Sequence, residues 1–273
     1  MQQHIIALTS PAYEGRAVGT EGEQKAASYL ETQLANWQLE PWTELGLPTH
    51  IHKFKVPDTD LVGHNVIAVH RGTSDRWLLL VAHYDHLGVK EGRLYPGADD
   101  NAVAVAILLE VSRCLATGIR APVDNVAFVF TSGEEMGLSG SRALANKIRE
   151  GKLASRCRVV NLDMLGGIGG SSLDVWCESS RPSAKKLATQ TRRAIQAAGL
   201  KSKRVRKRFG AVDSRAFAEV RMPSVTLSWA YEAQYHPHRH RTSDSWEQLE
   251  PEILQPAGRA VLQVTWALAN MSD

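Results

Sequence analysis

Two adjacent glutamates, Glu134 and Glu135, follow the apolar segment Val126–Phe130. Such a segment is typical of a buried strand, so the two carboxylates are expected at the end of that strand. Carboxylates placed so close together repel each other, and this raises the pKa of one of them. A bound cation would relieve the repulsion for one glutamate, and the other could then act as a general base.

Further carboxylates and imidazoles stand at comparable places along the chain. They are His83, Asp85, Asp99, Asp100, Asp163 and the histidines of the loop 235–244. None of the three cysteines has a spacing typical of a metal site. Oxygen and nitrogen donors without thiolates predict a metal site that suits zinc, with cobalt or manganese as substitutes.

Each of these residues alone also has an ordinary structural interpretation. His83 could be a satisfied core histidine, but Asp85 lies two residues further on and would face the same way on an extended strand end. A carboxylate there could accept a hydrogen bond from the imidazole and orient it toward a metal. Asp99 and Asp100 precede a helical pattern, so one of them could cap the helix while the other binds metal.

Helical and strand patterns alternate along the chain. Helices are predicted over 23–37, 102–115, 139–150, 181–198 and 250–269, and strands over 65–70, 77–82, 123–130, 158–162, 173–177 and 224–228. Several strands are apolar throughout, which favours an α/β fold with a single domain over 1–273 and a mainly parallel twisted sheet sandwiched by helices. Pro256 is expected to bend or delay the last helix.

The predicted topology places the candidate residues together. His83, Glu134 and Asp163 each fall just after a predicted strand, and Asp100 falls just before a predicted helix. In parallel sheets, ligands bind outside the carboxyl ends of the strands. Five ligands for two ions would leave room for a bridging water, whose pKa two cations can lower.

Composition limits the other functions. The 273 residues carry a net charge of +3 with both signs mixed, which gives no case for nucleic acid apart from the basic segment Lys201–Arg208, expected to be a solvated surface. No apolar run is long enough to span a membrane. The start of the chain does not read as a signal peptide, so the protein is expected to be cytoplasmic, or secreted or periplasmic if a leader has been removed. Oligomeric state and disulfides are left open.

Short motifs throughout the chain resemble metallopeptidase family 28, the co-catalytic di-zinc aminopeptidases. The motifs are Gly15-Arg16, Gly19-Thr20, Asn65–Ala68, Ala82–Gly88, Gly97–Ala102, Gly133–Ser141, Asn161–Met164, and His240 with Asp244. Each motif is short, but the order and spacing of the motifs together resemble this family specifically. The resemblance implies a zinc aminopeptidase fold of the phosphorylase/hydrolase-like α/β/α type.

The resemblance also implies a role for each matching residue. Asp100 would bridge two zinc ions; His83 and Asp163 would complete one site, and Glu135 and His240 the other. Glu134 would be the general base and Asp85 would orient His83. The family's last ligand stands four residues before an aspartate, as His240 does before Asp244, whereas His236 and His238 do not fit. The implied substrate is a peptide or aminoacyl compound that loses its N-terminal residue.

Some positions depart from the family pattern. Val103-Ala104 replaces small residues, Arg239 stands where a tyrosine is frequent, and Val212-Asp213-Ser214 replaces a Ser-Asp-His sequence. Asp213 and Tyr235 are therefore only candidate pocket residues. The alternatives are a mono-zinc glutaminyl cyclase, a carboxypeptidase that would use Arg239 and Arg241, and a binding protein on an inactive peptidase scaffold, which the intact ligand set disfavours.

Overall fold

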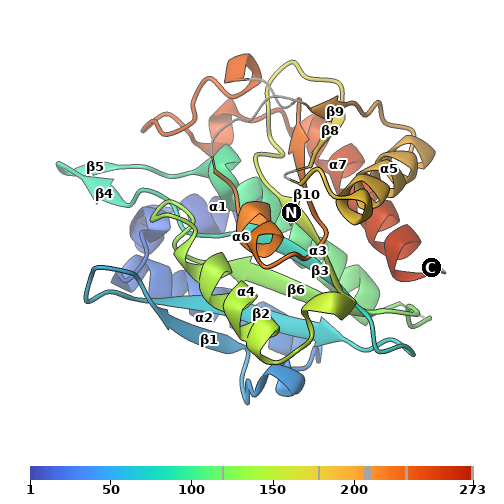
Figure 1. Ribbon diagram of the computed structural model, residues 1–273. Helices are drawn as coiled ribbons and strands as arrows, with labels where there is room; N and C mark the ends of the chain where they lie inside the picture. Colours follow the sequence, from blue (N-terminus) through green and yellow to red (C-terminus); the bar gives the residue numbers. More distant parts are fainter. Residues whose placement is uncertain (119, 178, 206–210, 231–232, 272–273) are drawn as a thin grey trace.

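An eight-stranded sheet forms the centre of the computed structural model, which describes all residues except 119, 178, 206–210, 231–232 and 272–273 (Figure 1). The strand order is β1-β2-β6-β3-β7-β10-β8-β9. The strands are β1 (Ile51–Lys55), β2 (Val62–His70), β3 (Trp77–His83), β6 (Asn125–Thr131), β7 (Cys157–Leu162), β8 (Leu173–Trp176), β9 (Arg204–Val205) and β10 (Ser224–Trp229). A separate hairpin joins β4 (Val89–Lys90) to β5 (Arg93–Leu94).

The four central strands β6, β3, β7 and β10 run parallel to one another. β2 joins β6 in the antiparallel direction, β1 joins β2 likewise, and β8 lies antiparallel to β10 on the other side. The prediction of a mainly parallel sheet is thus confirmed for its centre. The four central strands all end at the same edge of the sheet, as parallel strands must.

The side chains of the central strands supply two cores, one on each face of the sheet. In β3, Leu78 and Leu80 belong to the core on one face, whereas Leu79 and Val81 belong to the core on the other. This alternation is the two-residue period of a strand, and it explains why every residue of β3 is buried.

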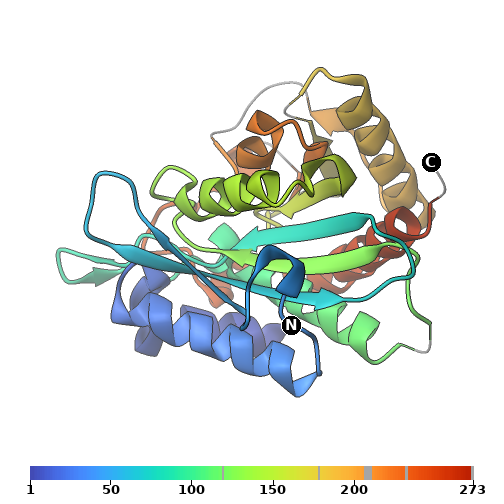
Figure 2. The same ribbon diagram turned by 60° about the horizontal axis from the view of Figure 1, so that its bottom comes forward.

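Helices cover both faces. The first core contains side chains of α1 (Gln2–Thr9), α2 (Glu21–Asn36), α3 (Val103–Ala116), α5 (Pro182–Ala197) and α7 (Pro251–Ala269). The second contains side chains of α4 (Ser139–Glu150) and α6 (Ser214–Glu219). Figure 2 shows α2 and α4 on opposite sides of the sheet. The sandwich of helices around the sheet is therefore as predicted.

The predicted elements agree with the observed ones within a few residues, with one correction and several additions. α7 begins at Pro251 and continues through Pro256, so the expected delay of this helix is wrong. The sequence patterns missed α1, α6, β1, β9, the hairpin and a 3-10 helix over Pro11–Arg16. These elements are short, or mix polar with apolar residues.

The structure also bears on membrane spans, on the cysteines and on the basic segment of the sequence. Among the described residues, no helix has the length and apolar character needed to cross a membrane. In the part of the chain that the structure describes, Cys114, Cys157 and Cys177 take part in no disulfide bond. Within the basic segment Lys201–Arg208, Lys203 lies 3.8 Å from Asp174, and residues 206–208 fall outside the described part of the chain.

Candidate metal centre

Two neighbouring strands present the first pair of candidate ligands. His83 is the last residue of β3, and Asp163 directly follows β7. The register of these parallel strands pairs Val81 with Asn161, so its continuation brings position 83 beside position 163. The His83 Nε2 atom accordingly lies 3.9 Å from the Asp163 Oδ1 atom, and both side chains are buried.

Asp100 lies between two histidines. Its Oδ1 atom is 3.3 Å from His83 Nε2, and its Oδ2 atom is 3.2 Å from His240 Nε2. Each carboxylate oxygen therefore faces a different imidazole, which is the arrangement expected of a carboxylate shared by two cations.

The two glutamates face different parts of the site. The Glu135 Oε1 atom is 3.2 Å from His240 Nε2. A carboxylate oxygen of Glu134 instead lies within 4.8 Å of donor atoms of both His83 and Asp163. The structure thus brings together all five residues expected to be ligands, with Glu134 beside them.

Unsatisfied atoms test whether a cation fits this arrangement. Asp100 Oδ2, Glu135 Oε1 and His240 Nε2 are buried atoms without an aligned hydrogen bond. Buried polar atoms are nearly always satisfied, so such a group needs a missing partner. Two donors on one tetrahedral zinc lie about 3.3 Å apart, because zinc bonds to nitrogen and oxygen measure about 2.0–2.1 Å. The observed separations of 3.2 Å match this value.

The pKa shifts show how strongly these groups depend on one another. Burial alone would raise the pKa of Glu135, but the nearby imidazoles of His240 and His86 lower it to about 2. Burial likewise opposes ionisation of Asp100, and His240 and His83 outweigh it, so its pKa lies well below the usual value. Hydrogen bonding to Asp100 and then Glu135 raises the pKa of His240 to about 9. The carboxylates are therefore ionised and ready to bind a cation.

Glu134 behaves in the opposite way. Burial raises its pKa well above the usual value, and the charges of Asp163 and Asp213 add to this effect, while His83 opposes it. A carboxyl group with a raised pKa holds a proton more readily near neutral pH. This property suits a group that takes up a proton and releases it again.

The loop between β10 and α7 orients the central carboxylate. Asp244 accepts hydrogen bonds from the main-chain amides of Asp99 and Asp100, at 2.8 and 3.1 Å. His240, four residues earlier, has a φ of 57°, which is uncommon for a residue with a side chain. The same loop therefore supplies one donor and fixes the main chain that carries another.

Arg16 ties the N-terminal segment to this region. Its guanidinium is fully buried and donates hydrogen bonds to the carbonyl oxygens of Leu8, Tyr84, Pro96 and Gly97. Burial lowers the pKa of Arg16 to about 10, and Asp244, Asp85 and Asp100 oppose the shift. The group therefore stays charged at neutral pH.

Asparagines fix two of the loops that carry donors. The Asn101 side chain donates to Leu162 O and accepts from Met164 N, and so brackets Asp163. The Asn65 side chain accepts from Ser132 N and thereby holds the loop before Glu134.

Asp85 acts differently from the expectation. The hydrogen-bond partner of His83 Nδ1 is the main-chain carbonyl of Asp85, at 3.1 Å, while the carboxylate oxygen Oδ1 is 3.7 Å away. The carboxylate instead accepts from the main-chain amides of Glu134 and Glu135, at 3.2 and 3.3 Å. Asp85 therefore orients His83 with its main chain and the two glutamates with its side chain.

His236, His238 and Asp99 are outside the cluster of donors. Asp99 does not cap α3, because its side chain accepts from Gly166 N at 2.8 Å and meets His236 Nδ1 at 2.5 Å. His238 contacts Ser243 in the exposed loop. Of the three histidines in this loop, it is His240 that meets Asp100 and Glu135.

The two candidate pocket residues have unequal positions. Asp213 is buried, accepts a hydrogen bond from Thr131 Oγ1 at 2.6 Å, and has a pKa that burial raises to about 6. Tyr235 is half-buried and packs against the larger core. Arg239 places its Nε atom 3.4 Å from Asp100 Oδ2, whereas Arg241 is exposed.

His86 is a member of the cluster that the sequence patterns missed. Its Nδ1 atom lies 3.0 Å from Glu135 Oε1, and its side chain is buried. Together with Asp100 and Glu135 it forms a group whose donor atoms lie within 4.8 Å of one another. The only signal in the sequence was its place three residues after His83.

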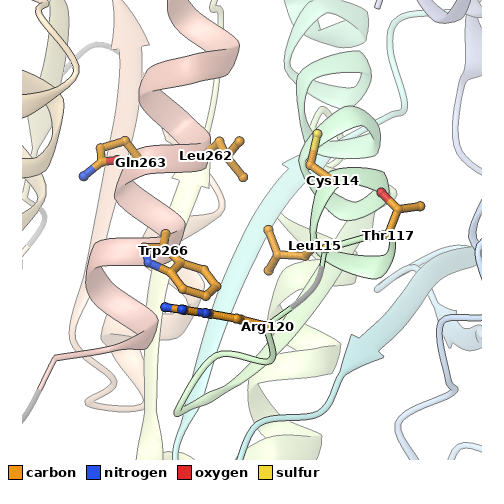
Figure 3. A pocket seen from close by; sticks show the side chains of 8 residues that line it. Cys114, Leu115, Thr117, Arg120, Leu262, Gln263 and Trp266 are labelled. Carbon is orange, nitrogen blue, oxygen red and sulfur yellow. The ribbon is translucent and has the colours of Figure 1, made fainter.

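A separate groove of about 690 Å³ lies between α3 and α7. Figure 3 shows Cys114 and Leu115 on α3, and Leu262 and Trp266 on α7. This end of α3 is opposite to its start near Asp100, about 20 Å away along a helix of this length. The groove is therefore not part of the cluster of donors.

An α/β sheet with buried acids and imidazoles at its carboxyl edge defines a class of metal-binding hydrolase folds. Comparison with known families places the protein within this class: residues 65–265 match peptidase family M28. The chain belongs to this family.

Individual relatives are more distant. The chain is 27% identical to aminopeptidase YwaD of Bacillus subtilis over 221 residues, 74% of this chain and 44% of YwaD. It is 31% identical to a probable zinc metalloprotease of Pyricularia oryzae over 176 residues, 59% of this chain and 34% of that protein. The chain thus spans less than half the length of these curated relatives.

Solved structures share the fold at low sequence identity. The LapA aminopeptidase of Legionella pneumophila has a TM-score of 0.81 and 19% identity, with 99% of this chain and 71% of that chain covered. A glutaminyl cyclase of Fimbriiglobus ruber has a TM-score of 0.78 and 20% identity, with 97% of this chain and 93% of that chain covered. The fold therefore occurs with both kinds of reaction.

Proposed function

We propose that the protein is a zinc-dependent aminopeptidase that holds two ions and removes N-terminal residues from peptides, with residues 1–273 forming one catalytic domain. The observation that carries the proposal is the shared position of Asp100, whose two oxygens face His83 and His240 separately. The names of aminopeptidase YwaD and of the Pyricularia zinc metalloprotease support the reaction and the metal.

The distances between the donor atoms support the ligand assignment that the family resemblance implies. His83 and Asp163 would hold the first ion, Glu135 and His240 the second, and Asp100 both. Zinc in such a site acts as a Lewis acid and lowers the pKa of water. Cobalt or manganese would be accepted by the same donors.

The protein's own residues would manage the protons. Glu134 lies beside His83 and Asp163, outside the proposed ligand set. It would take a proton from the attacking water and deliver it to the nitrogen of the leaving amine. Its raised pKa makes the carboxylate a stronger base for the first of these steps. Asp85, through the amides of Glu134 and Glu135, keeps the base and the neighbouring ligand in place.

A glutaminyl cyclase is the second candidate, because the Fimbriiglobus enzyme shares the fold. A cyclase with one zinc would not need two separate groups of donors. Donors for two ions are present here, His83 with Asp163 and Glu135 with His240, and Asp100 lies between the two pairs. This favours the two-ion peptidase. A carboxypeptidase would require a cation facing the substrate carboxylate, but Arg239 approaches Asp100 and Arg241 is exposed.

A substrate panel tests the proposal. Purified protein loaded with zinc would be assayed on aminoacyl-nitroanilides, on the same compounds with a blocked amine, on C-terminally varied dipeptides, and on peptides that begin with glutamine. We expect release of nitroaniline only from free-amine substrates, and its loss with chelator. Cleavage of blocked substrates, or cyclisation of N-terminal glutamine without hydrolysis, would contradict the proposal.

A further inference from the structure

His86 is a buried imidazole whose two ring nitrogens both lack an aligned hydrogen bond. Only 1% of its surface is exposed, so water does not satisfy these atoms freely. Buried polar groups without partners are costly, and a protein retains them where another group completes the arrangement. His86 therefore needs an explanation that packing does not supply.

The neighbours of His86 restrict its ring to one place. A Cβ atom on Gly97 would lie 2.5 Å from His86 Cγ, so the glycine leaves the room that the ring occupies. The ring also meets that of His240 edge to face, with centroids 5.8 Å apart. In this position Nδ1 is 3.0 Å from Glu135 Oε1.

Glu135 Oε1 is thus approached by two imidazoles, His240 at 3.2 Å and His86 at 3.0 Å. His240 also meets Asp100, which makes it a donor to the proposed second ion. His86 follows Asp85 in the sequence, and the Asp85 side chain accepts a hydrogen bond from the Glu135 amide. The same carboxylate oxygen of Glu135 therefore meets a proposed ligand, His240, and a second imidazole, His86.

We propose that His86 is a positioning residue of the second ion site: its Nδ1 atom, 3.0 Å from Glu135 Oε1, would align as a hydrogen-bond donor to that carboxylate when the ion is bound, and so set the direction of the carboxylate. The inference rests on the proposed two-ion site and adds a residue outside the five ligands. Metal-binding carboxylates generally depend on such outer partners, and their removal typically lowers metal affinity about 10- to 100-fold. A neutral imidazole with its proton on Nδ1 is sufficient for this role.

Zinc titration of the metal-free protein tests the inference without any turnover. A chromogenic chelator competes for the ions, and the affinities of the first and second equivalents are measured separately. The variants are His86→Ala, His86→Asn and, as a matched control, His238→Ala, whose ring lies in the surface loop. We expect His86→Ala to weaken the second equivalent about 10- to 100-fold and to leave the first within about twofold.

His86→Asn decides how the residue acts. The asparagine amide nitrogen can take the place of Nδ1 and donate to Glu135, but it is a poor zinc ligand. We expect it to restore most of the affinity and to leave the visible spectrum of the cobalt-loaded protein unchanged. Equal loss in both variants with an altered cobalt spectrum would make His86 a direct ligand and overturn the proposal, as would unchanged affinity in His86→Ala.

The test stays separate from the proposed activity. A wild-type protein that binds one equivalent would contradict the two-ion site, and the response of that single equivalent to His86→Ala and His86→Asn would still decide the role of His86. A circular dichroism spectrum of each metal-free variant shows whether it is folded. An unfolded His86→Ala variant would move the decision to His86→Asn alone.

Discussion

At the scale of single residues, the site separates two carboxylates that are adjacent in the sequence. Glu135 has a pKa lowered to about 2, whereas burial raises that of Glu134. The difference arises because two imidazoles outweigh burial at Glu135, whereas burial dominates at Glu134 and neighbouring acids add to it. Neighbouring groups whose surroundings move their pKa values apart are typical of an acid–base pair with divided roles.

Glu134→Gln is expected to keep the bound metal and lose turnover. Glutamine is nearly the same size but cannot carry a proton, and general acid–base catalysis contributes about 10²- to 10⁴-fold to rates. Steady-state hydrolysis of an aminoacyl-nitroanilide, with metal content by plasma emission, measures both. Exposed Glu150→Gln on α4 is the control. A Glu134→Gln variant with full activity would rule out its role as the base.

Asp100→Ala is expected to lose both ions, because its two oxygens face the donors of both. Dialysis followed by elemental analysis gives the number of equivalents retained. Asp60→Ala, on an exposed side chain, should behave as the wild type. Two equivalents retained by Asp100→Ala would show that Asp100 is not shared.

Most of the candidate donors could be predicted because chemistry and position coincide in the sequence. His83 ends a strand with an unmistakable apolar run, and Glu134 and Asp163 follow two more such strands. The role of His86 could not be predicted, because only the folded structure shows that its side chain lies beside Glu135. The hydrogen bond between His83 and the main-chain oxygen of Asp85 could not be predicted either, because the sequence does not show whether a residue uses its main chain or its side chain.

At the scale of elements, the turn before α3 determines where Asp100 points. The Asp244 side chain accepts hydrogen bonds from the main-chain amides of Asp99 and Asp100 in this turn. Gly97 begins the turn, with a φ of 60°. The central strands around this turn were predictable from continuous apolar runs. β1 was not, because its sequence Ile-His-Lys-Phe-Lys is mostly basic and gives neither an apolar run nor a regular alternation. α1 and α6 are too short to give a clear helical period.

Gly97→Ala is expected to destabilise this turn. A left-handed conformation costs a residue with a side chain about 1–2 kcal/mol, and the new Cβ would lie 2.4 Å from Asp100 O and 2.5 Å from His86 Cγ. Gly92→Ala is the matched control, because Gly92 has a φ of 71° with nothing within 4 Å. Zinc titration and thermal melting compare the two. Equal behaviour would show that the contacts around Gly97 are unimportant.

His52 on β1 should make stability depend on pH. Burial, with a smaller effect of Lys147, lowers its pKa to about 4, and Asn65 donates to its Nδ1 atom at 3.1 Å. The unfolded chain binds the proton near pH 6.5 and the folded protein near pH 4, so the free energy of unfolding falls as pH decreases between these values. The loss from this group is about 3 kcal/mol.

Urea unfolding of the metal-free protein from pH 7.5 to 4 measures this dependence. His52→Gln should have a shallower slope by about one proton, because glutamine does not titrate. His238→Gln, in the surface loop, should keep the slope of the wild type. An identical slope in His52→Gln would mean that the imidazole titrates alike in both states.

At the scale of the whole molecule, the proposed ions join segments that are remote in the sequence. His83, Asp163 and His240 come from β3, the end of β7 and the loop after β10. A ligand that binds only the folded chain stabilises it by about 2.7 kcal/mol at 100 times its dissociation constant. Chelation should therefore lower Tm by about 5–10 °C for a chain of this size. Calorimetry with and without chelator measures the shift, and zinc should reverse it.

The buried positive charge of Arg16 can partly balance the acidic residues of the site when no metal is bound. Its guanidinium is sealed inside, close enough to Asp85, Asp100 and Asp244 for their charges to act on it. Unlike zinc, this cation is covalently part of the chain and no chelator can extract it. After the proposed ions are removed, the positive charge of Arg16 would still act on these three aspartates. We therefore expect the metal-free protein to remain folded.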